Sequence, residues 1–443
     1  MKHILLFGAG KSASVLIDYL LDNAAANNWH VTVVDADAQL VLQKTKQHPA
    51  STAVAANVAQ ENERQALIKN ADVVISMMPP FLHILIATDC IEFGKHLLTA
   101  SYADDAIKAL APQAAAKGIL FLCEMGLDPG IDHMSALQLL ENIKAAGATI
   151  TSFKSHCGGL VAPESDDNPW HYKISWNPRN VVLAGKAGAS YLLNGQHYDE
   201  PYETLFNANR FINTGDANIG NLSYYPNRNS LPYIDLYQLQ SAQTFVRTTL
   251  RYQNFMYGWN HIVALHLTDE VGYYETNELS IAAFFKQHFE RFNIKQLFKN
   301  SYNANTAIEK IIEKQLQFLG INDDTTLINK GFASAADVLQ FLLETKLILH
   351  PHDKDMIVMQ HEIEYDLHQT KHYITSSCIV YGEDAIYTAM AKTVGLPLGI
   401  AAKLILNGSI QLTGLHLPII KAIYEPVLHE LAVNGIQFIE TKN

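Results

Sequence analysis

The sequence predicts an α/β protein whose first domain is a doubly wound parallel sheet of the Rossmann type. Three observations support this prediction. Strand and helix patterns alternate over the first 130 residues, a glycine-rich turn follows the first strand, and an acidic residue ends the second strand. The chain has 443 residues, which is too long for one ordinary core, so two or three domains are expected.

The predicted strands of this domain are short apolar runs. HILLFG (3–8) is followed by AGKSASVLIDYLLDNA, in which apolar residues recur at helical spacing. Strands that alternate with helices form a parallel sheet, and ligands bind such sheets outside the carboxyl ends of the strands. The further strands expected are HVTVVD (30–35), DVVISMM (72–78), HLLTAS (96–101) and ILFLCEM (119–125), with a helix over 104–118.

The turn after the first strand has the pattern G-x-G-x-x-A, from Gly8 to Ala13. Gly8 permits the tight turn, Gly10 lets a pyrophosphate approach the backbone, and Ala13 allows close helix–strand packing. Many strand–helix turns use glycine for geometry alone, but the position directly after the first strand favours dinucleotide binding. The cofactor contacts predicted in this turn are Gly8, Ala9, Gly10, Lys11 and Ser12.

The acids that follow the second strand bear on the choice of cofactor. Asp35 comes 25 residues after Gly10, close to the spacing of the carboxylate that accepts hydrogen bonds from the adenosine ribose. Asp37 follows, and no Arg or Lys lies between the two acids. A 2′-phosphate would meet two carboxylates without a cation, so NAD(H) is favoured and NADP(H) is the alternative. A structural interpretation is that Asp35 only ends the strand and Asp37 caps the next helix.

Two more polar turns follow predicted strands. GLDPGIDH (126–133) closes the strand that begins near Ile119, and TASY (99–102) ends the preceding strand with hydroxyl side chains. Asp-Pro-Gly is common turn chemistry. Its position at the carboxyl end of a sheet strand is, however, where a bound nicotinamide is expected.

After residue 133 the pattern changes. TITSFKSH (149–156) alternates like a half-buried antiparallel strand and leads into the loop GGLVAPESDDNPWHYKISW (158–176). The first half of this loop has no helix or strand period, and its mixture of glycine, acids and tryptophan is typical of a ligand-binding loop. The alternative is a structural Ω-loop packed by its own tryptophans.

Three arginines lie among apolar neighbours in the aromatic-rich segments that follow. Arg228 and Arg251 stand in extended segments and are interpreted as fixed forks for carboxylates. For Arg247 an ordinary surface position is favoured.

The last third of the chain predicts helices, then two strands, then apolar helices. NTAIEKIIEKQLQFLGI (305–321) and SAADVLQFLLETKLIL (334–349) have helical spacing, and the second starts with a Ser N-cap. MIVMQHEIEYDL and HYITSSCIVYG alternate with period two. The apolar segment YTAMAKTVGLPLGIAAKLILNG is interrupted by Lys, Gly and Pro, so it predicts buried helices rather than a membrane span. Four histidines fit a polar sheet face or hairpin as well as a metal site, and no metal is predicted: His352, His361, His368 and His372.

Composition narrows the class of protein. Apolar residues make up 48% and charged residues 17% of the chain, which fits a well-packed globular enzyme. The net charge of −12 and the lack of a basic patch argue against a nucleic-acid partner. No signal-peptide pattern opens the sequence, so a cytoplasmic protein without membrane association is expected. The scattered cysteines suit a reducing compartment and neither a disulfide framework nor a zinc site: Cys90, Cys123, Cys157 and Cys378.

Five segments together carry a family resemblance: GLDPGIDH, CGGLVAPESDDNPWHYKISW, YPNRNS, TLRYQ and AMAKTVGLPLGIAAKLILNG. In order and spacing the chain resembles saccharopine dehydrogenase of the glutamate-forming kind, also called saccharopine reductase, over essentially its whole length. The resemblance implies a Rossmann domain, an α+β substrate domain with a mixed sheet, and an inserted helical domain. The expected bounds are 1–130 with a C-terminal return at 386–443, 131–265 with 350–385, and 266–349.

The resemblance also implies an NAD(P)-dependent oxidoreductase of lysine metabolism that converts saccharopine to glutamate and 2-aminoadipate 6-semialdehyde. Asp128 is then the base or the hydrogen-bond partner of the substrate amine, and Tyr102 and Cys157 are alternative proton carriers. The implied substrate residues are Ser101, Tyr102, Asp128, Arg228, Thr249, Leu250 and Arg251. The further cofactor residues implied are Asn57, Met77, Ala100, Ser101 and Trp176.

In this interpretation the loop 158–176 lines the substrate cleft. Gly158 and Gly159 let backbone approach the ligand, and the loop acids Glu164, Asp166 and Asp167 either set the loop's fold or hold ammonium groups of the substrate.

Two positions depart from the family pattern. Asp35-Ala36-Asp37 stands where NADP-using members place a basic or hydroxyl pair, and Asn229 stands where Asp is usual. Two rival functions remain open: a related imine reductase such as carboxynorspermidine dehydrogenase, and a non-catalytic nucleotide-binding redox sensor. The expected partner is a small amino-acid substrate, and a homodimer is compatible with the sequence, which does not fix the oligomeric state.

Overall fold

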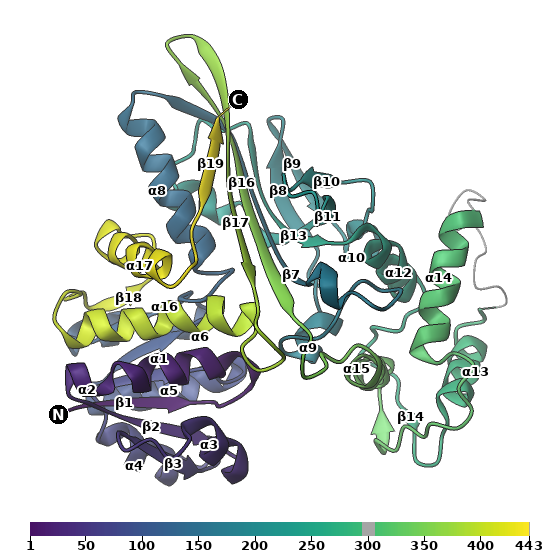
Figure 1. The fold of residues 1–443 in the computed structure, drawn as a ribbon, viewed down its shortest axis with the longest axis horizontal. Coiled ribbons are helices and arrows are strands. Elements are labelled where there is room, and N and C mark those ends of the chain that lie inside the picture. Colours follow the sequence, from purple (N-terminus) through teal and green to yellow (C-terminus); the bar gives the residue numbers. More distant parts are fainter. Residues whose placement is uncertain (295–305, 443) are drawn as a thin grey trace. The chain divides into compact units, whose positions relative to one another are not determined.

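The computed structural model describes residues 1–294 and 306–442. The chain forms two compact units, each with its own sheet (Figure 1). Unit 1 comprises Met1–Thr149 and Cys378–Glu440, and unit 2 comprises Ile150–Ser377 with the chain end from Thr441.

The sheet of unit 1 confirms the predicted Rossmann domain. It has seven strands in the order β18-β6-β5-β4-β1-β2-β3, and every recorded pairing between neighbours is parallel. The order reverses at β1, which is the topological switch point of a doubly wound sheet. The strands are β1 (Lys2–Phe7), β2 (Trp29–Asp35), β3 (Ser51–Ala55), β4 (Val73–Ser76), β5 (His96–Thr99), β6 (Leu120–Leu122) and β18 (Gly414–His416).

Helices connect these strands, as the alternating pattern predicts. The helix expected over 104–118 is divided into two short helices, and Pro112 stands at the start of the second, where its missing N–H costs no helical hydrogen bond. The helices of unit 1 are η1 (Lys11–Ala13), α1 (Ser14–Asp22), α2 (Ala24–Asn27), α3 (Ala38–Thr45), α4 (Glu61–Lys69), α5 (Pro80–Phe93), α6 (Asp105–Ala109), α7 (Ala111–Ala116), α8 (Ile131–Ala145), α16 (Ala389–Leu406) and α17 (Lys421–Val433).

Helix α16 is long and apolar enough to cross a membrane by length and composition, but 78% of it is buried inside the protein. It runs alongside α1 (Figure 1). Two glycines make this close packing possible, because a Cβ on Gly395 would lie 2.9 Å from Leu16 Cβ and one on Gly399 would lie 2.5 Å from the Tyr19 ring. The prediction of a buried segment is confirmed, although one continuous helix replaces the several that were expected.

The second sheet is mixed. Its main path runs β10-β11-β13-β7-β16-β17-β19, with β13 parallel to β7 and antiparallel to β11. Strands β14 (Tyr274–Glu275) and β15 (Phe332–Ala333) form a separate pair. The ten strands of the mixed sheet are β7 (Thr149–Val161), β8 (Ala189–Leu193), β9 (Gln196–Glu200), β10 (Phe211–Asn213), β11 (Asn221–Pro226), β12 (Arg228–Asn229), β13 (Thr244–Arg251), β16 (Asp355–Leu367), β17 (Thr370–Tyr381) and β19 (Ile439–Lys442).

The prediction for residues 149–161 was wrong in length and orientation. Strand β7 continues through Gly158 and Gly159 to Val161, and it pairs in parallel with β13. Gly158 is needed for this pairing, since a Cβ there would lie 2.6 Å from Leu250 Cβ. Gly158 is therefore required for the close packing of β7 against β13.

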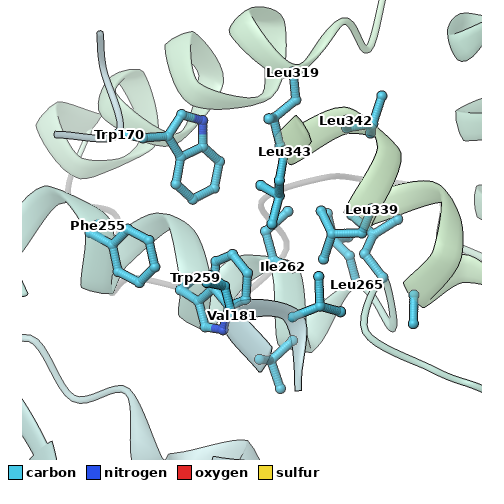
Figure 2. Packing of buried hydrophobic residues seen from close by; sticks show 14 of the residues in the cluster. Trp170, Val181, Phe255, Trp259, Ile262, Leu265, Leu319, Leu339, Leu342 and Leu343 are labelled. Carbon is cyan, nitrogen blue, oxygen red and sulfur yellow. The ribbon is translucent and has the colours of Figure 1, made fainter. Parts of the chain in front are cut away.

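Most helices of unit 2 share one apolar core with the loop that follows β7, and η2 and α11 lie outside it. Trp170 packs edge-on against Trp259, whose ring stacks on Phe255, and Leu319 and Leu343 lie in the same cluster (Figure 2). The helices are η2 (Pro163–Ser165), α9 (Pro178–Val182), α10 (Tyr202–Leu205), α11 (Pro232–Leu236), α12 (Gln253–Ala264), α13 (Ile281–Arg291), α14 (Thr306–Leu319) and α15 (Ala335–Lys346).

The compact units differ from the expected domain bounds in three ways, the first of which is that the C-terminal return to unit 1 begins at Cys378 and not at residue 386. Residues 131–149, which include α8, belong to unit 1, and the helical insertion 266–349 belongs to unit 2 and has no core of its own. The predicted helix 305–321 appears as α14, although residue 305 lies outside the described residues. The predicted Ser N-cap is confirmed as a full capping box between Ser334 and Asp337.

Candidate functional site

In unit 1 the predicted site residues gather along one edge of the parallel sheet. Each lies at or just after the carboxyl end of a strand, and in a parallel sheet these ends share one edge. In order of strands they are Gly8, Ala9, Gly10, Lys11 and Ser12 after β1, Asp35 at the end of β2, Asn57 after β3, Met77 after β4, Ala100, Ser101 and Tyr102 after β5, and Asp128 after β6.

The glycine turn has the geometry that a dinucleotide pyrophosphate requires. Gly8 has φ +101°, and a Cβ there would lie 3.1 Å from the carbonyl carbon of Met77. Gly10 is exposed, and nothing stands within 4 Å of the place where its Cβ would be. The backbone at Gly10 is therefore open to a ligand group that approaches the start of η1 and α1.

Asp35 is built into this turn. Its Oδ2 accepts a hydrogen bond from the Ala9 N–H at 2.8 Å, and its Oδ1 accepts one from the Asp37 N–H at 3.2 Å. Asp37 caps α3, because its Oδ1 accepts hydrogen bonds from two backbone N–H groups in the first turn of that helix. The structural interpretation thus holds for Asp37, while Asp35 joins β2 to the glycine turn.

Two of the implied cofactor residues have local structural partners as well. Asn57 is exposed, and its Oδ1 accepts a hydrogen bond from the Ala59 N–H at 3.0 Å. The Met77 N–H donates to the Phe7 carbonyl at 2.8 Å, which ties the end of β4 to the glycine turn.

The Asp128 turn depends on glycine. Gly130 has φ +147°, and a Cβ there would lie 2.1 Å from the Gly126 carbonyl oxygen. The Asp128–Pro129 peptide bond is cis, and the Gly130 N–H donates to Asp132 Oδ1 at 2.6 Å. A narrow loop thus carries Asp128 at the carboxyl end of β6.

Asp128 lies next to Tyr102. The tyrosine hydroxyl donates a hydrogen bond to Asp128 Oδ1 across 3.3 Å, and both side chains are partly exposed. This pair joins the turn after β5 to the turn after β6. It places a carboxylate and a phenol together, two groups that can pass a proton to or from a ligand.

Sequence reasoning missed the groups that support this pair. Glu124 is 4% exposed and has φ +60°, and its Oε2 lies 2.9 Å from His133 Nε2. Its Oε1 accepts a hydrogen bond from the Ala103 N–H at 3.2 Å. His83 of α5 was missed too, although a histidine inside the apolar run PFLHILIATDC was a visible signal.

In unit 2 the predicted residues lie on β7 and β13. Cys157 and Thr249 are register partners, so their backbones are adjacent. The Leu250 side chain is fully buried, and the Leu250 carbonyl accepts a hydrogen bond from Arg251 Nη1 at 2.8 Å. Leu250 is therefore buried as a whole residue, side chain and backbone together.

The three arginines have different environments. Arg251 is 4% exposed, and its guanidinium lies over the rings of Tyr172 and Phe255. Arg228 is exposed, in β12, with φ +54°. The expectation that Arg247 is a surface residue was wrong: it is 2% exposed and lies 4.4 Å from the Tyr233 ring centroid, because β13 is an interior strand of the sheet.

The acids of the loop after β7 set its fold. Asp166 Oδ2 lies 2.6 Å from His171 Nδ1. Lys173 is buried and donates to Asp167 at 2.9 Å and to Asp353 at 2.6 Å. Burial opposes the charge on Lys173, but its hydrogen bonds to Asp353 and Asp167 outweigh burial and raise its pKa.

The tryptophans of the loop are also engaged. Trp170 is fully buried and donates to the Gln315 carbonyl at 3.1 Å, while the partly exposed Trp176 donates to the Tyr172 hydroxyl at 3.1 Å. The alternative of a loop packed by its own tryptophan therefore holds for Trp170. The side chain of Trp176 is partly exposed and can contact a ligand.

The glycine turn, the doubly wound sheet and the polar strand ends define a two-domain dinucleotide-binding protein of the Rossmann class. Residues 4–122 match the family model described as "Saccharopine dehydrogenase NADP binding domain", and residues 126–436 match "Saccharopine dehydrogenase C-terminal domain". The chain belongs to the saccharopine dehydrogenase family, which confirms the resemblance seen in its motifs.

Relatives of known name are similar over nearly the whole chain. The mitochondrial alpha-aminoadipic semialdehyde synthase of Rattus norvegicus is 34% identical over 99% of this chain, but the chain spans only 47% of that relative. The Saccharomyces cerevisiae "Saccharopine dehydrogenase [NADP(+), L-glutamate-forming]" is 32% identical, with 97% of this chain and 96% of the relative covered. An apo structure of saccharopine dehydrogenase (L-Glu forming) from the same yeast superposes over 100% of both chains, with a TM-score of 0.87 and 31% identity.

Proposed function

We propose that the chain catalyses the reversible, nicotinamide-dependent oxidation of saccharopine to glutamate and 2-aminoadipate 6-semialdehyde. When bound, the oxidised nicotinamide accepts a hydride. The secondary amine of the substrate becomes an imine, water adds to the imine, and the C–N bond breaks to release the two products. The observation that carries the proposal is the Tyr102–Asp128 pair, which lies on the same sheet edge as the glycine turn.

The Tyr102–Asp128 pair supplies what the chemistry requires of the protein. A protonated amine cannot lose hydride, so a base must remove its proton first. An Asp128 carboxylate at the carboxyl end of β6 can accept that proton, and the Tyr102 hydroxyl can stabilise the carboxylate before the transfer. Cys157 is the alternative proton carrier, and its 6% exposure favours Asp128.

The carboxylates of the substrate fit the arginines of unit 2. Arg251 is buried, its Nε has no hydrogen-bond partner among the described residues, and no carboxylate of the described chain forms an ion pair with it. A buried guanidinium without a counter-charge is costly, and a ligand carboxylate would offset that cost.

Arg228 would bind a different carboxylate from Arg251. The Asn227 N–H donates to the Arg247 carbonyl across the sheet, so Arg228 lies about five residues along β13 from Arg251. Five strand residues span roughly 16 Å. This separation supports an elongated substrate with carboxylates at both ends.

The choice between the two nicotinamide dinucleotides rests on Asp35. The fungal relatives carry NADP(+) in their names, and so does the matched domain model. We nevertheless propose NAD(H), because the Asp35 and Asp37 carboxylates at the end of β2 would repel a 2′-phosphate. A cytoplasmic, reducing location is proposed with it, supported by the burial and wide scatter of the four cysteines along the chain.

The test is nicotinamide absorbance with purified protein and saccharopine, with NAD⁺ and NADP⁺ in parallel. Reduction of NAD⁺ with release of glutamate supports both parts of the proposal. Reduction of NADP⁺ alone keeps the reaction and overturns the cofactor choice. If neither cofactor is reduced, the reaction is overturned, and polyamine imines are the next substrates to assay.

A further inference from the structure

His83 joins two strand ends of unit 1 in a buried hydrogen-bond network. It lies in the first turn of α5 and is 3% exposed. Its Nδ1 is 2.8 Å from the hydroxyl of Ser76, the last residue of β4. Its Nε2 is 2.8 Å from the Ser101 hydroxyl and 3.2 Å from the hydroxyl of Thr99, the last residue of β5. Ser101 is the only one of these hydroxyl residues that is partly exposed.

The His83 imidazole is neutral at physiological pH. Burial lowers its pKa to about 4, and the opposing effect of the Asp104 carboxylate is smaller. A neutral imidazole carries one ring proton, so one nitrogen donates and the other accepts. The position of that proton decides what the bonded hydroxyl groups do.

The two tautomers give Ser101 opposite roles. With the proton on Nδ1, the imidazole donates to Ser76, and Nε2 accepts from the Ser101 hydroxyl at 2.8 Å in preference to the Thr99 hydroxyl at 3.2 Å. With the proton on Nε2, the imidazole donates to Ser101 Oγ, Ser76 donates to Nδ1, and the Ser101 O–H can point to a ligand. Of these two arrangements, only the second turns the Ser101 O–H toward an anionic oxygen of a ligand while Ser101 keeps its 2.8 Å bond to the imidazole.

We propose that His83 is a positioning residue that sets the Ser101 hydroxyl as a donor to a substrate carboxylate, and that carboxylate binding selects the Nε2–H tautomer. The inference rests on the proposed function, since it takes the ligand beside Tyr102 and Asp128 to be an amino acid with carboxylate groups. It adds a residue that does not touch the ligand and that acts through Ser101.

The chain offers a matched pair of variants. In His83→Gln the longer amide reaches the position of Nε2 and can still donate to Ser101. In His83→Asn the shorter amide reaches only the position of Nδ1 and keeps the bond to Ser76. His96→Gln is the control, because His96 begins β5 at the opposite end of the strand and bonds only the Leu120 N–H among the hydrogen bonds recorded for it.

We expect His83→Asn to raise KM for saccharopine on the order of ten- to hundred-fold, the size of one hydrogen bond to a charged group. The KM for the nicotinamide cofactor should stay unchanged. His83→Gln should recover most of the loss, and His96→Gln should not change either KM. In a Ser101→Ala background, His83→Asn should have no further effect on KM. Equal losses for Asn and Gln, or effects of His83→Asn and Ser101→Ala that simply add, would overturn the inference.

A spectroscopic experiment tests the tautomer directly and does not depend on turnover. The ¹⁵N signals of the His83 imidazole are assigned as those absent from the spectrum of the His83→Asn variant. Spectra of the full chain are then recorded with and without glutamate, which serves as the carboxylate probe. The expected result is a shift to the Nε2–H pattern with glutamate, which Ser101→Ala abolishes. An unchanged pattern overturns the inference. Failure of saccharopine oxidation by the unmodified chain overturns the proposed function instead, and the imidazole spectrum then decides the inference alone.

Discussion

The hydroxyl of Tyr102 donates a hydrogen bond to the Asp128 carboxylate across 3.3 Å. The two residues follow adjacent parallel strands, β5 and β6, so the sheet brings together side chains that are 26 positions apart. Their support is buried: Glu124 accepts from the backbone directly after Tyr102 and contacts His133 at the start of α8. Buried groups of unit 1 thus support the pair.

Replacement of the carboxylate should remove the base without loss of the fold. Asp128→Asn keeps an acceptor for the Tyr102 hydroxyl but cannot take a proton, so kcat for saccharopine oxidation should fall about 10²- to 10⁴-fold. KM for the cofactor should change little. Tyr102→Phe should have a smaller effect, and Asp105→Asn, at an exposed position of α6, should have none. Steady-state kinetics at saturating cofactor measures all three, and an Asp128→Asn enzyme of normal kcat would exclude Asp128 as the base.

The preference for NAD(H) should weaken when the charge at Asp35 is removed. Asp35→Asn keeps an oxygen that accepts from the Ala9 N–H, so the glycine turn should hold its geometry. The neutral amide no longer repels a 2′-phosphate, and the ratio of kcat/KM for NAD⁺ to that for NADP⁺ should drop roughly tenfold, a change of about 1.4 kcal/mol. Asp37→Asn is the comparison and should change this ratio less, because Asp37 caps α3. A ratio that is unaffected by Asp35→Asn would contradict the role given to this carboxylate.

The sequence was informative for unit 1 because its elements are local. Short apolar runs, a glycine turn and helical spacing predicted five of the seven strands, and the order of strands placed the candidate residues on one edge. Strand β18 could not be predicted, since it pairs with β6 from nearly 300 residues away. The chemistry of the turns after β5 and β6 was visible as polar residues. Their buried partners Glu124 and His83 were missed, and of the two only His83 left a signal, as a histidine within an apolar helical run.

The sequence was less informative for unit 2, where long-range pairing decides. The sequence predicts a surface position for Arg247. The residue is buried because β13 lies between β7 and β11 in the sheet. The pair Gly158–Gly159 suggests that backbone approaches a ligand, whereas the structure shows that Gly158 is needed because the neighbouring strand approaches at Leu250. The acids of the loop 158–176 show no periodicity, and only the folded chain shows that two of them bond to His171 and Lys173.

The free energy of unfolding should decline as the pH falls below about 6.5, the usual pKa of a histidine side chain. Burial lowers the pKa of His83 to about 4 and that of His156 to about 3, from 6.5. Above pH 6.5 both are neutral in the folded and unfolded chain, and they make no pH-dependent contribution. As the pH falls below 6.5 the unfolded chain takes up protons that the folded chain does not, and each residue costs about 1.4 kcal/mol per pH unit until its folded pKa is reached.

Urea unfolding between pH 7.5 and 5 measures this loss. His156→Gln removes one of the two groups and should lessen the decline of the midpoint with acid, whereas His352→Gln, at an exposed position, should leave the decline unchanged. A midpoint that is flat from pH 7.5 to 5 in the unmodified chain would show that these imidazoles are not buried in the neutral form.

Substitution by alanine should have different effects at two glycines of unit 1: it should lower stability at Gly130 and weaken cofactor binding at Gly10. Gly130→Ala forces a Cβ to within 2.1 Å of the Gly126 carbonyl oxygen at a φ of +147°, so the Asp128 turn must rearrange. The expected loss of unfolding free energy is about 2 kcal/mol or more, together with lower kcat. Gly10→Ala places its Cβ in open space and should leave the thermal midpoint nearly unchanged. It should instead weaken cofactor binding, because the methyl group occupies the approach to the backbone. Thermal unfolding and cofactor titration of both variants separate the two effects, and a Gly10→Ala protein that binds NAD⁺ normally would show that the glycine turn is not a pyrophosphate site.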